Sequence, residues 1–187
     1  MPTINVGSIS EIQTQIANIS NNMQADDLVL EITGDLTASS GDFSTGPDNH
    51  ETLFAVGLED SDTLTIRSAG SNTFRIDADQ FGRIFDITNG TVVLRDLVLT
   101  GGLLSGDGGT AGGNDGQHAL GAAIRNASDE DLTLDSLELF GNHATGGGGG
   151  SGYGGGGGSG VYGTGGGYGG AIPPDSGEPP SNGDGGD

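Results

Sequence analysis

Closely spaced acidic residues are the groups in this sequence best suited to chemistry. Asp77 and Asp79 lie two positions apart, and Asp107 and Asp115 lie within one glycine-rich stretch. Because calcium prefers carboxylate oxygens, these four residues are candidate calcium ligands. A pair such as Asp77 and Asp79 could also supply the two carboxylates of a glycosidase. The simpler alternative is that these acids form a solvated face and keep the chain soluble in salt.

Basic residues are few, and they are the other candidates for catalysis. A polysaccharide lyase needs a base, and the candidates are Arg67, Arg75, Arg83, Arg95, Arg125, His50, His118 and His143. No two arginines fall at one strand position in the repeat described below, so we expect exposed arginines in local ion pairs. The sequence has no nucleophile elbow, zinc-ligand spacing or phosphate loop. It leaves enzymatic activity open and favours a non-enzymatic role.

The charge balance excludes several classes of partner. Among 187 residues, 26 are acidic and 5 are basic, which gives a formal net charge of −21. Such a chain is unsuited to nucleic acid or to anionic membrane surfaces. It has no cysteine and no run of eighteen apolar residues, so neither disulfides nor membrane insertion is expected. Its start, "MPTINVGSIS", lacks the pattern of a secretory signal peptide.

Two periodicities predict the elements that position these residues. Ile9, Ile12, Ile16, Ile19 and Met23 recur every three or four positions and predict an amphipathic helix over 8–23. Ser8 or Ser10 is a suitable N-cap, and Asn21 and Asn22 a suitable stop. From residue 28 the period is two, and short strands are expected near 28–32, 64–66, 74–76, 84–87 and 92–99.

An internal repeat indicates how the strands are arranged. The segment "NGTVVLRDLVLTGG" aligns with "DEDLTLDSLELFGN", which places Asp96 and Ser136 at the same corner between two strands. "GAAI" at 121–124 is restated as "GGAI" at 169–172, as though another copy began there. A period of a few tens of residues is typical of a solenoid of stacked β coils.

The residues Gly121, Ala123, Ile124, Asn126, Leu132, Thr133, Leu134, Gly141 and Asn142 carry a "GxAIxN…LTLxxxxxxGN" pattern. This pattern resembles the right-handed parallel β-helix repeats of polymorphic outer-membrane-protein-like and pectate-lyase-like bacterial surface proteins. The resemblance covers about residues 1 to 172. It implies an all-β fold in which the N-terminal strand and helix cap the first coil. It implies less about function, because such families include adhesins and polysaccharide-acting enzymes.

Two insertions, at 101–120 and 144–168, are predicted to leave the same corner of successive coils. Their glycines allow two alternatives, a floppy surface loop or close packing of polyproline-II-like segments into a contact surface. For the second alternative the proposed contact residues are Gly146, Tyr153, Val161, Tyr162, Tyr168 and Ile172.

The sequence thus predicts an N-terminal strand and helix over 1–27, β-helix coils over 28–172, and a flexible acidic tail over 173–187. The tail cannot complete a coil, so the C-terminal coil is expected to be open, either because the chain is a piece of a longer protein or because another copy completes the coil. We expect a bacterial extracellular or cell-surface structural or adhesive protein, exported without a signal peptide. Copies of it would associate into oligomers or filaments through the open coil and the glycine-rich surface. Alternatives are the N-terminal part of a lyase-type or epimerase-type enzyme, or a calcium- or glycan-binding module.

Overall fold

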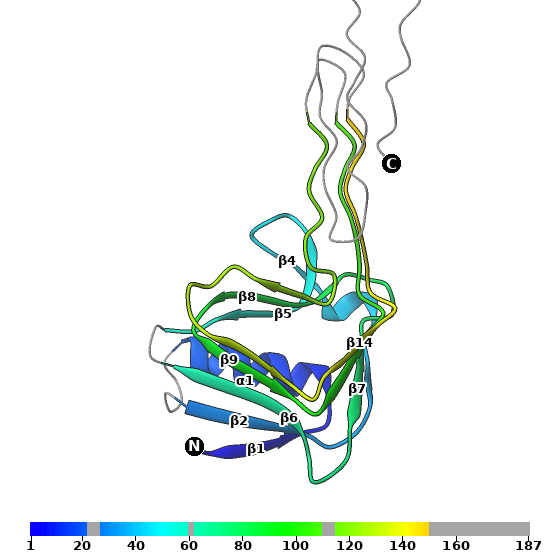
Figure 1. The fold of residues 1–187 in the computed structure, drawn as a ribbon. Helices are drawn as coiled ribbons and strands as arrows, with labels where there is room; N and C mark the ends of the chain where they lie inside the picture. The colour runs from blue at the N-terminus through cyan, green and yellow to red at the C-terminus, as the bar shows by residue number, and fades with distance from the viewer. Residues whose placement is uncertain (22–26, 60–61, 110–114, 150–187) are drawn as a thin grey trace, which may run out of the picture. The chain divides into compact units, whose positions relative to one another are not determined.

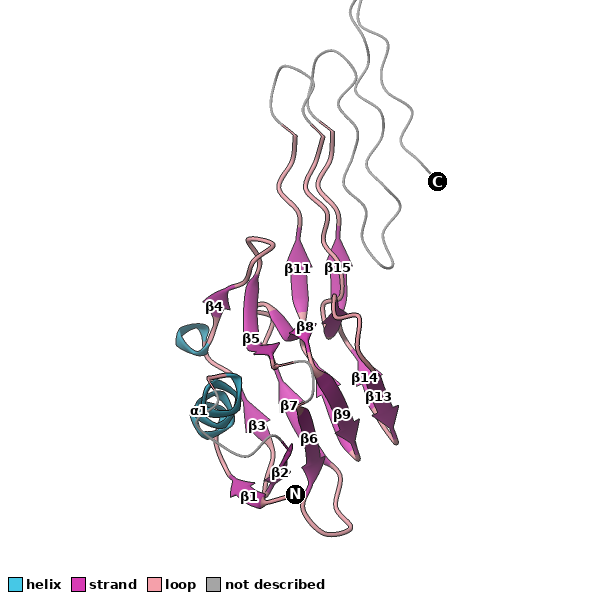
Figure 2. Ribbon diagram, turned by 90° about the vertical axis from the view of Figure 1, so that its left-hand side faces the viewer, coloured by secondary structure: helices cyan, strands magenta, loops and turns pink. Residues whose placement is uncertain are grey.

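The computed structural model describes residues 1–21, 27–59, 62–109 and 115–149. The chain divides into two compact units, of which the first comprises Met1–Leu103 and Ala122–Asn142. The second comprises Leu104–Gly121 and His143–Asp187. Most of the described elements are strands in parallel sheets, as Figures 1 and 2 show. The prediction of a β-rich fold with little helix is confirmed.

Three sheets make up the first unit. The first sheet contains, in spatial order, β1 (Thr3–Val6), β2 (Asp27–Ile32), β6 (Thr63–Ser68), β9 (Thr91–Arg95) and β13 (Leu132–Asp135). The second contains β3 (Leu36–Thr37), β7 (Phe74–Asp77), β10 (Leu97–Thr100) and β14 (Glu138–Phe140). The third contains β4 (Ser44–Thr45), β5 (Glu51–Gly57), β8 (Arg83–Asn89) and β12 (Ile124–Asn126). Among the described strands of these three sheets, β4–β5 is the only antiparallel pair. The chain visits the three sheets in turn and then returns to the first.

The sequence repeat lies in paired strands. Leu132 pairs with Val92 in the first sheet, and Glu138 pairs with Val98 in the second. The turns that join these strands also match, because Asp96 and Ser136 have φ of 54° and 55°. This left-handed conformation is uncommon for residues with a Cβ. The two copies therefore share one corner geometry, as the sequence alignment predicts.

Inward side chains stack from strand to strand. Leu30, Ile66 and Leu94 occupy paired positions of the first sheet, and all three are fully buried. In the third sheet the rings of Phe54 and Phe85 lie 5.1 Å apart between their centroids. Because neighbouring strands are only about 4.8 Å apart, each side chain covers the one before it and the core continues along the stack.

Helix α1 (Ile9–Ser20) covers one end of this core. The Ser8 hydroxyl accepts a hydrogen bond from the Glu11 amide at 3.2 Å, which caps the first turn, and Asn21 is the C-cap. The predicted apolar stripe is buried in the core, and its members are Ile9, Ile12, Ile16 and Ile19. Met23 lies outside the described residues. Figure 2 shows α1 beside β3 and β4, with β13 and β14 at the far end of the stack.

Some short elements are not predicted by the sequence patterns. The clearest is β5, whose sequence "ETLFAVG" does not alternate, since Leu53 and Phe54 are adjacent and both buried. A 3₁₀ turn (Ser40–Asp42) and β4 precede it. In the described part of the chain, no helix is long and apolar enough to cross a membrane.

Candidate functional site

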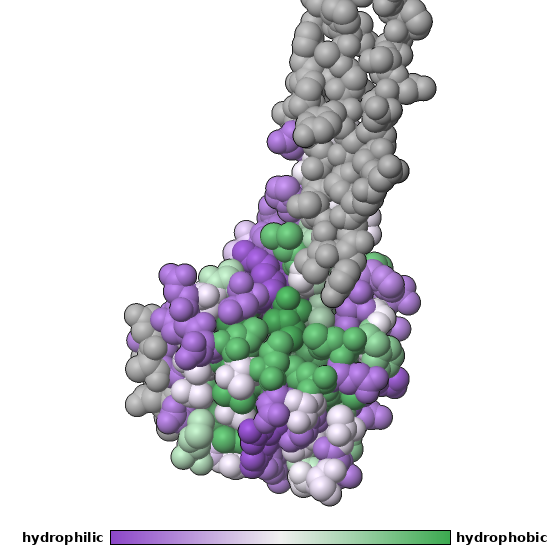
Figure 3. Space-filling model, in the orientation of Figure 1, coloured by the Kyte–Doolittle hydropathy of each residue, from purple (hydrophilic) through white to green (hydrophobic). Residues whose placement is uncertain are grey.

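An apolar surface is exposed where the three sheets end. Leu134 and Leu139 are 48% and 49% exposed, whereas their partners Leu94 and Leu99 are fully buried. Within the part of the chain that the structure describes, the stacking that covers each earlier side chain ends at these leucines. We call Leu132, Leu134, Leu137 and Leu139 the end surface, and Figure 3 shows apolar side chains gathered there with polar residues around them.

The backbone at this end is also open. β12, β13 and β14 are the last strands of their sheets among the residues that the structure describes. One edge of each strand thus presents amide and carbonyl groups without a neighbouring strand, an arrangement that favours pairing with another chain. At the opposite end, α1 buries its isoleucines and keeps Ser10, Glu11 and Thr14 exposed. The two ends of the first unit therefore differ in chemistry.

The second unit is described over three extended segments, 104–109, 115–121 and 143–149. It begins with β11 (Leu103–Ser105) pairing with β15 (His143–Thr145). Beyond these strands the Gly106 amide donates to the Thr145 carbonyl at 2.8 Å. The Gly109 amide donates to the Gly148 carbonyl at 2.7 Å. The contact repeats every three residues, which is the period of polyproline II.

The middle segment, 115–121, is hydrogen-bonded to both of the other segments, 104–109 and 143–149. The Gln117 amide donates to the Asp107 carbonyl at 2.8 Å, and the Gly147 amide donates to the Gln117 carbonyl at 3.0 Å. A Cβ on Gly147 would overlap the Asp107 backbone, and a Cβ on Gly106 would overlap the Gln117 backbone. Glycine is required here by close packing of backbone on backbone. These contacts favour the packed alternative for the described part of the insertions.

Of the predicted contact residues, only Gly146 lies within the described chain, where it is half-buried. The other five fall outside the described residues, and they are Tyr153, Val161, Tyr162, Tyr168 and Ile172. Their part in a contact surface stays a prediction.

The predicted calcium ligands are divided between the two units, with Asp77 and Asp79 in the first and Asp107 and Asp115 in the second. Asp77 Oδ1 accepts a hydrogen bond from the Asp79 amide at 2.9 Å, and its Oδ2 lies 3.9 Å from Arg75. Asp107 and Asp115 are exposed residues of the second unit. Among the described residues, no group of three or more histidine or acidic side chains could hold a metal ion. Calcium binding therefore stays a prediction.

The expectation of locally paired arginines is confirmed, with two corrections. Arg67 pairs with Glu31 at 2.6 Å, and Arg95 pairs with Asp135 at 2.7 Å. Arg67 and Arg95 do share a strand position, contrary to the sequence prediction. The reason is that β6 and β9 are offset by 28 residues, so the longer repeat does not align them. The second correction is Arg83, which is fully buried and not exposed.

Arg83 lies in a buried network of charges. Its guanidinium is 2.7 Å from Asp48 and 3.3 Å from Asp86, and Arg125 lies 2.9 Å from Asp86. The consecutive amides of Ile84 and Phe85 donate to the carbonyls of Ala122 and Ala123, just before β12, so both point to the same edge and the alternation of β8 is broken. This irregularity explains how Arg83 and Asp86, three positions apart, meet on one side.

The network lowers the pKa of Asp48. Burial acts to raise the pKa of Asp48, but the hydrogen bond and charge of Arg83, together with nearby His50, outweigh it and hold the pKa below its usual value of 3.8. The buried His50 ring has Nδ1 at 3.2 Å from the Asp48 carbonyl, and its Nε2 has no hydrogen-bond partner within the described structure. His118 and His143, the other candidate bases, are exposed.

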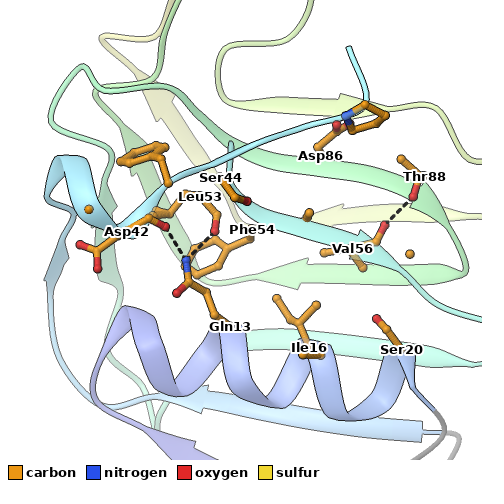
Figure 4. Close-up of a pocket in the computed structure, with 16 residues that line it drawn as sticks. Gln13, Ile16, Ser20, Asp42, Ser44, Leu53, Phe54, Val56, Asp86 and Thr88 are labelled. Atoms are coloured by element: carbon orange, nitrogen blue, oxygen red, sulfur yellow. Dashed lines mark hydrogen bonds between the residues drawn. The ribbon is translucent and has the colours of Figure 1, made fainter. Parts of the chain in front are cut away.

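A groove of about 560 Å³ runs between α1 and β5 (Figure 4). One wall is α1, which contributes Ile16, Ala17 and Ser20, and segment 41–47 borders the groove. β5 contributes the exposed Ala55 and Gly57. The Gln13 amide group closes one end, since its Nε2 donates to the carbonyls of Asp42 at 2.6 Å and Leu53 at 2.9 Å. No sequence pattern indicates this groove, because β5 does not alternate and the sequence therefore does not predict it.

No protein-family model, curated protein or solved structure matches this chain. Its function is therefore inferred from the end surface, the glycine-rich segments, the charge network and the groove.

Proposed function

We propose that the chain is a right-handed parallel β-helix that acts as an extracellular structural or adhesive protein. In this proposal its copies associate through the end surface. The order in which the chain visits the three sheets supports a helical path, and so do the corners at Asp96 and Ser136.

The half-exposed leucines of the end surface are the observation that carries the proposal. Leu134 and Leu139 continue buried rows of the core, and no strand of the described residues lies above them. Exposed apolar surface of this kind is typical of interaction sites. A second copy of the same surface would cover leucines with leucines and pair open strand edges. Such a contact between identical surfaces is two-fold symmetric.

Filaments need a second contact, because α1 covers the other end of the stack with a polar surface. The packed glycine segments of the second unit, which include Gly146, are the proposed second contact. The net charge of −21 and the absence of lysine support a soluble, exported protein, and a surface glycan stays a proposed additional partner. The arginines proposed as catalytic bases are engaged in ion pairs, so they do not support the alternative of a lyase or epimerase.

Sedimentation velocity and negative-stain electron microscopy on the purified chain test this proposal. We expect dimers or larger assemblies at physiological salt, and Leu134→Glu should convert them to monomers. Added millimolar calcium should change the assemblies only if the predicted aspartates bind it. Thr133→Glu is the matched control, because Thr133 is exposed on the other face of the same strand.

Monomers of the wild-type chain at every tested concentration would contradict self-association. Assemblies that Leu134→Glu leaves intact would contradict the assignment to the end surface. Circular dichroism of both variants separates these outcomes from loss of the fold.

A further inference from the structure

Half of β5 has an open edge that faces α1. β4 pairs with β5 only through Ser44–Thr52 and Thr45–Glu51, and the residues just before β4 belong to the 3₁₀ turn (Ser40–Asp42) and not to a strand on this edge. From Leu53 onward, no described strand lies on this edge of β5. The Leu53 carbonyl on this edge accepts a hydrogen bond from Gln13 of α1 at 2.9 Å.

The direction of the backbone groups follows from their partners. The Val56 carbonyl accepts a hydrogen bond from the Thr88 hydroxyl, so it points toward β8. The register between β5 and β8 shifts only after Val56. The Leu53 carbonyl points the opposite way, toward Gln13. Because backbone groups alternate between the two edges of a strand, the amide and carbonyl of Ala55 also face α1 and the groove.

The groove has the two parts that strand addition needs. An unpaired edge supplies backbone hydrogen bonds, and the adjoining wall supplies side-chain contacts. Here the wall is α1, with apolar Ile16 beside small Ala17 and Ser20, and Figure 4 shows Ile16 and Ser20 directed toward β5. The volume of about 560 Å³ is in the range of ligand sites.

We infer that this groove binds an extended, basic peptide segment of a partner protein, which adds a strand to the open edge of β5 beside α1. Charge selects this occupant. The net charge of −21 favours a basic partner, and Asp42 lines the groove, whereas the buried Asp86 in its lining is already paired with Arg83 and Arg125. No basic side chain of the described structure lines the groove. All five arginines of the chain are already ion-paired, and the acidic tail beyond residue 172 has no basic residue, so this chain does not supply the complement. This inference is independent of self-association through the end surface.

The test uses a fluorescein-labelled peptide of alternating lysine and valine, six residues long, with the full chain at 150 mM NaCl. We expect saturable binding by fluorescence anisotropy. The same peptide with every backbone amide N-methylated keeps its charge but has no backbone N–H to donate to β5, and its binding should be at least about tenfold weaker. Hydrogen exchange should slow in residues 53–57 when the unmodified peptide is bound.

Two variants of α1 locate the site. Ala17→Phe fills the groove and should weaken binding at least about tenfold. Thr14→Phe is the matched control, since Thr14 is exposed on the same helix outside the groove, and it should bind as the wild type does. No binding by the wild type, equal binding of the N-methylated peptide, or binding unaffected by Ala17→Phe would overturn the inference. Binding of a neutral oligosaccharide in place of the peptide would overturn it as well.

Discussion

Arg83 and Arg95 carry the same charge in opposite surroundings. Arg83 is fully buried between Asp48 and Asp86, and removing it would leave Asp86, also fully buried, to Arg125 alone. Loss of one partner from a buried network is costly, so Arg83→Met should lower the free energy of unfolding by about 3–5 kcal/mol.

Arg95→Met provides the comparison, because the Arg95 side chain is 46% exposed and its pair with Asp135 is on the surface. It should cost no more than about 1 kcal/mol. Urea unfolding of both variants measures the difference. Equal losses would mean that the buried network contributes no more than a surface ion pair.

Asp48 should make stability depend on pH in the acid range. Its pKa is held below 3.8 in the folded chain, so the unfolded chain takes up this proton first as the pH falls. The stabilisation is complete above about pH 4 and is lost as the pH falls through the lower, folded pKa. Asp48→Asn should therefore be less stable than the wild type at pH 5, and the gap should narrow at pH 3.

Urea unfolding at the two pH values measures this narrowing. Glu59→Gln, at an exposed position, is the control. Its free energy of unfolding should change between pH 5 and pH 3 by the same amount as that of the wild type. If the difference in free energy of unfolding between the wild type and Asp48→Asn were the same at both pH values, a lowered pKa of Asp48 in the folded chain would be contradicted.

The contact between Asp48 and Arg83 also shows which part of the structure the sequence does not predict. The repeat predicts the paired leucines of β9 and β13 and the corners at Asp96 and Ser136, because each is a local pattern. The contact between Asp48 and Arg83 spans 35 positions and depends on an irregularity in β8. Nothing local to either residue encodes it.

At the scale of the elements, α1 and the glycine segments differ in how they are specified. Four isoleucines at helical spacing predict the buried face of α1 from the sequence alone. The glycine segments have no such pattern, since it is the absence of side chains that lets their backbones approach. Sequence alone therefore leaves two alternatives, and only the backbone hydrogen bonds favour packing.

Two adjacent glycines test that packing. Gly147→Ala would drive a Cβ into the Asp107 backbone, whereas the Cβ of Gly148→Ala would have no atom within 4 Å. Overpacking of this kind typically costs about 1–3 kcal/mol. We expect faster amide exchange across segments 104–109, 115–121 and 143–149 in Gly147→Ala, with little change in Gly148→Ala. Similar exchange in both variants would contradict close packing at Gly147.

For the whole molecule, charge and apolar surface act in opposite directions on self-association. The net charge of −21 makes any two copies repel, while the end surface with Leu134 and Leu139 favours contact. Repulsion between exposed charges is screened over about 10 Å at 0.1 M salt and about 3 Å at 1 M, whereas apolar burial is not weakened. Association should therefore strengthen as salt is raised.

Sedimentation velocity at 20 mM and 500 mM NaCl measures this effect, with the associated fraction expected to rise at the higher salt. Leu134→Glu should remain monomeric at both concentrations, because it adds a charge to the surface that copies would bury. If association instead weakened with salt, ion pairs between copies would be the main attraction. The five arginines, all engaged within the chain, would then have to exchange partners, and the end surface would not be the principal contact.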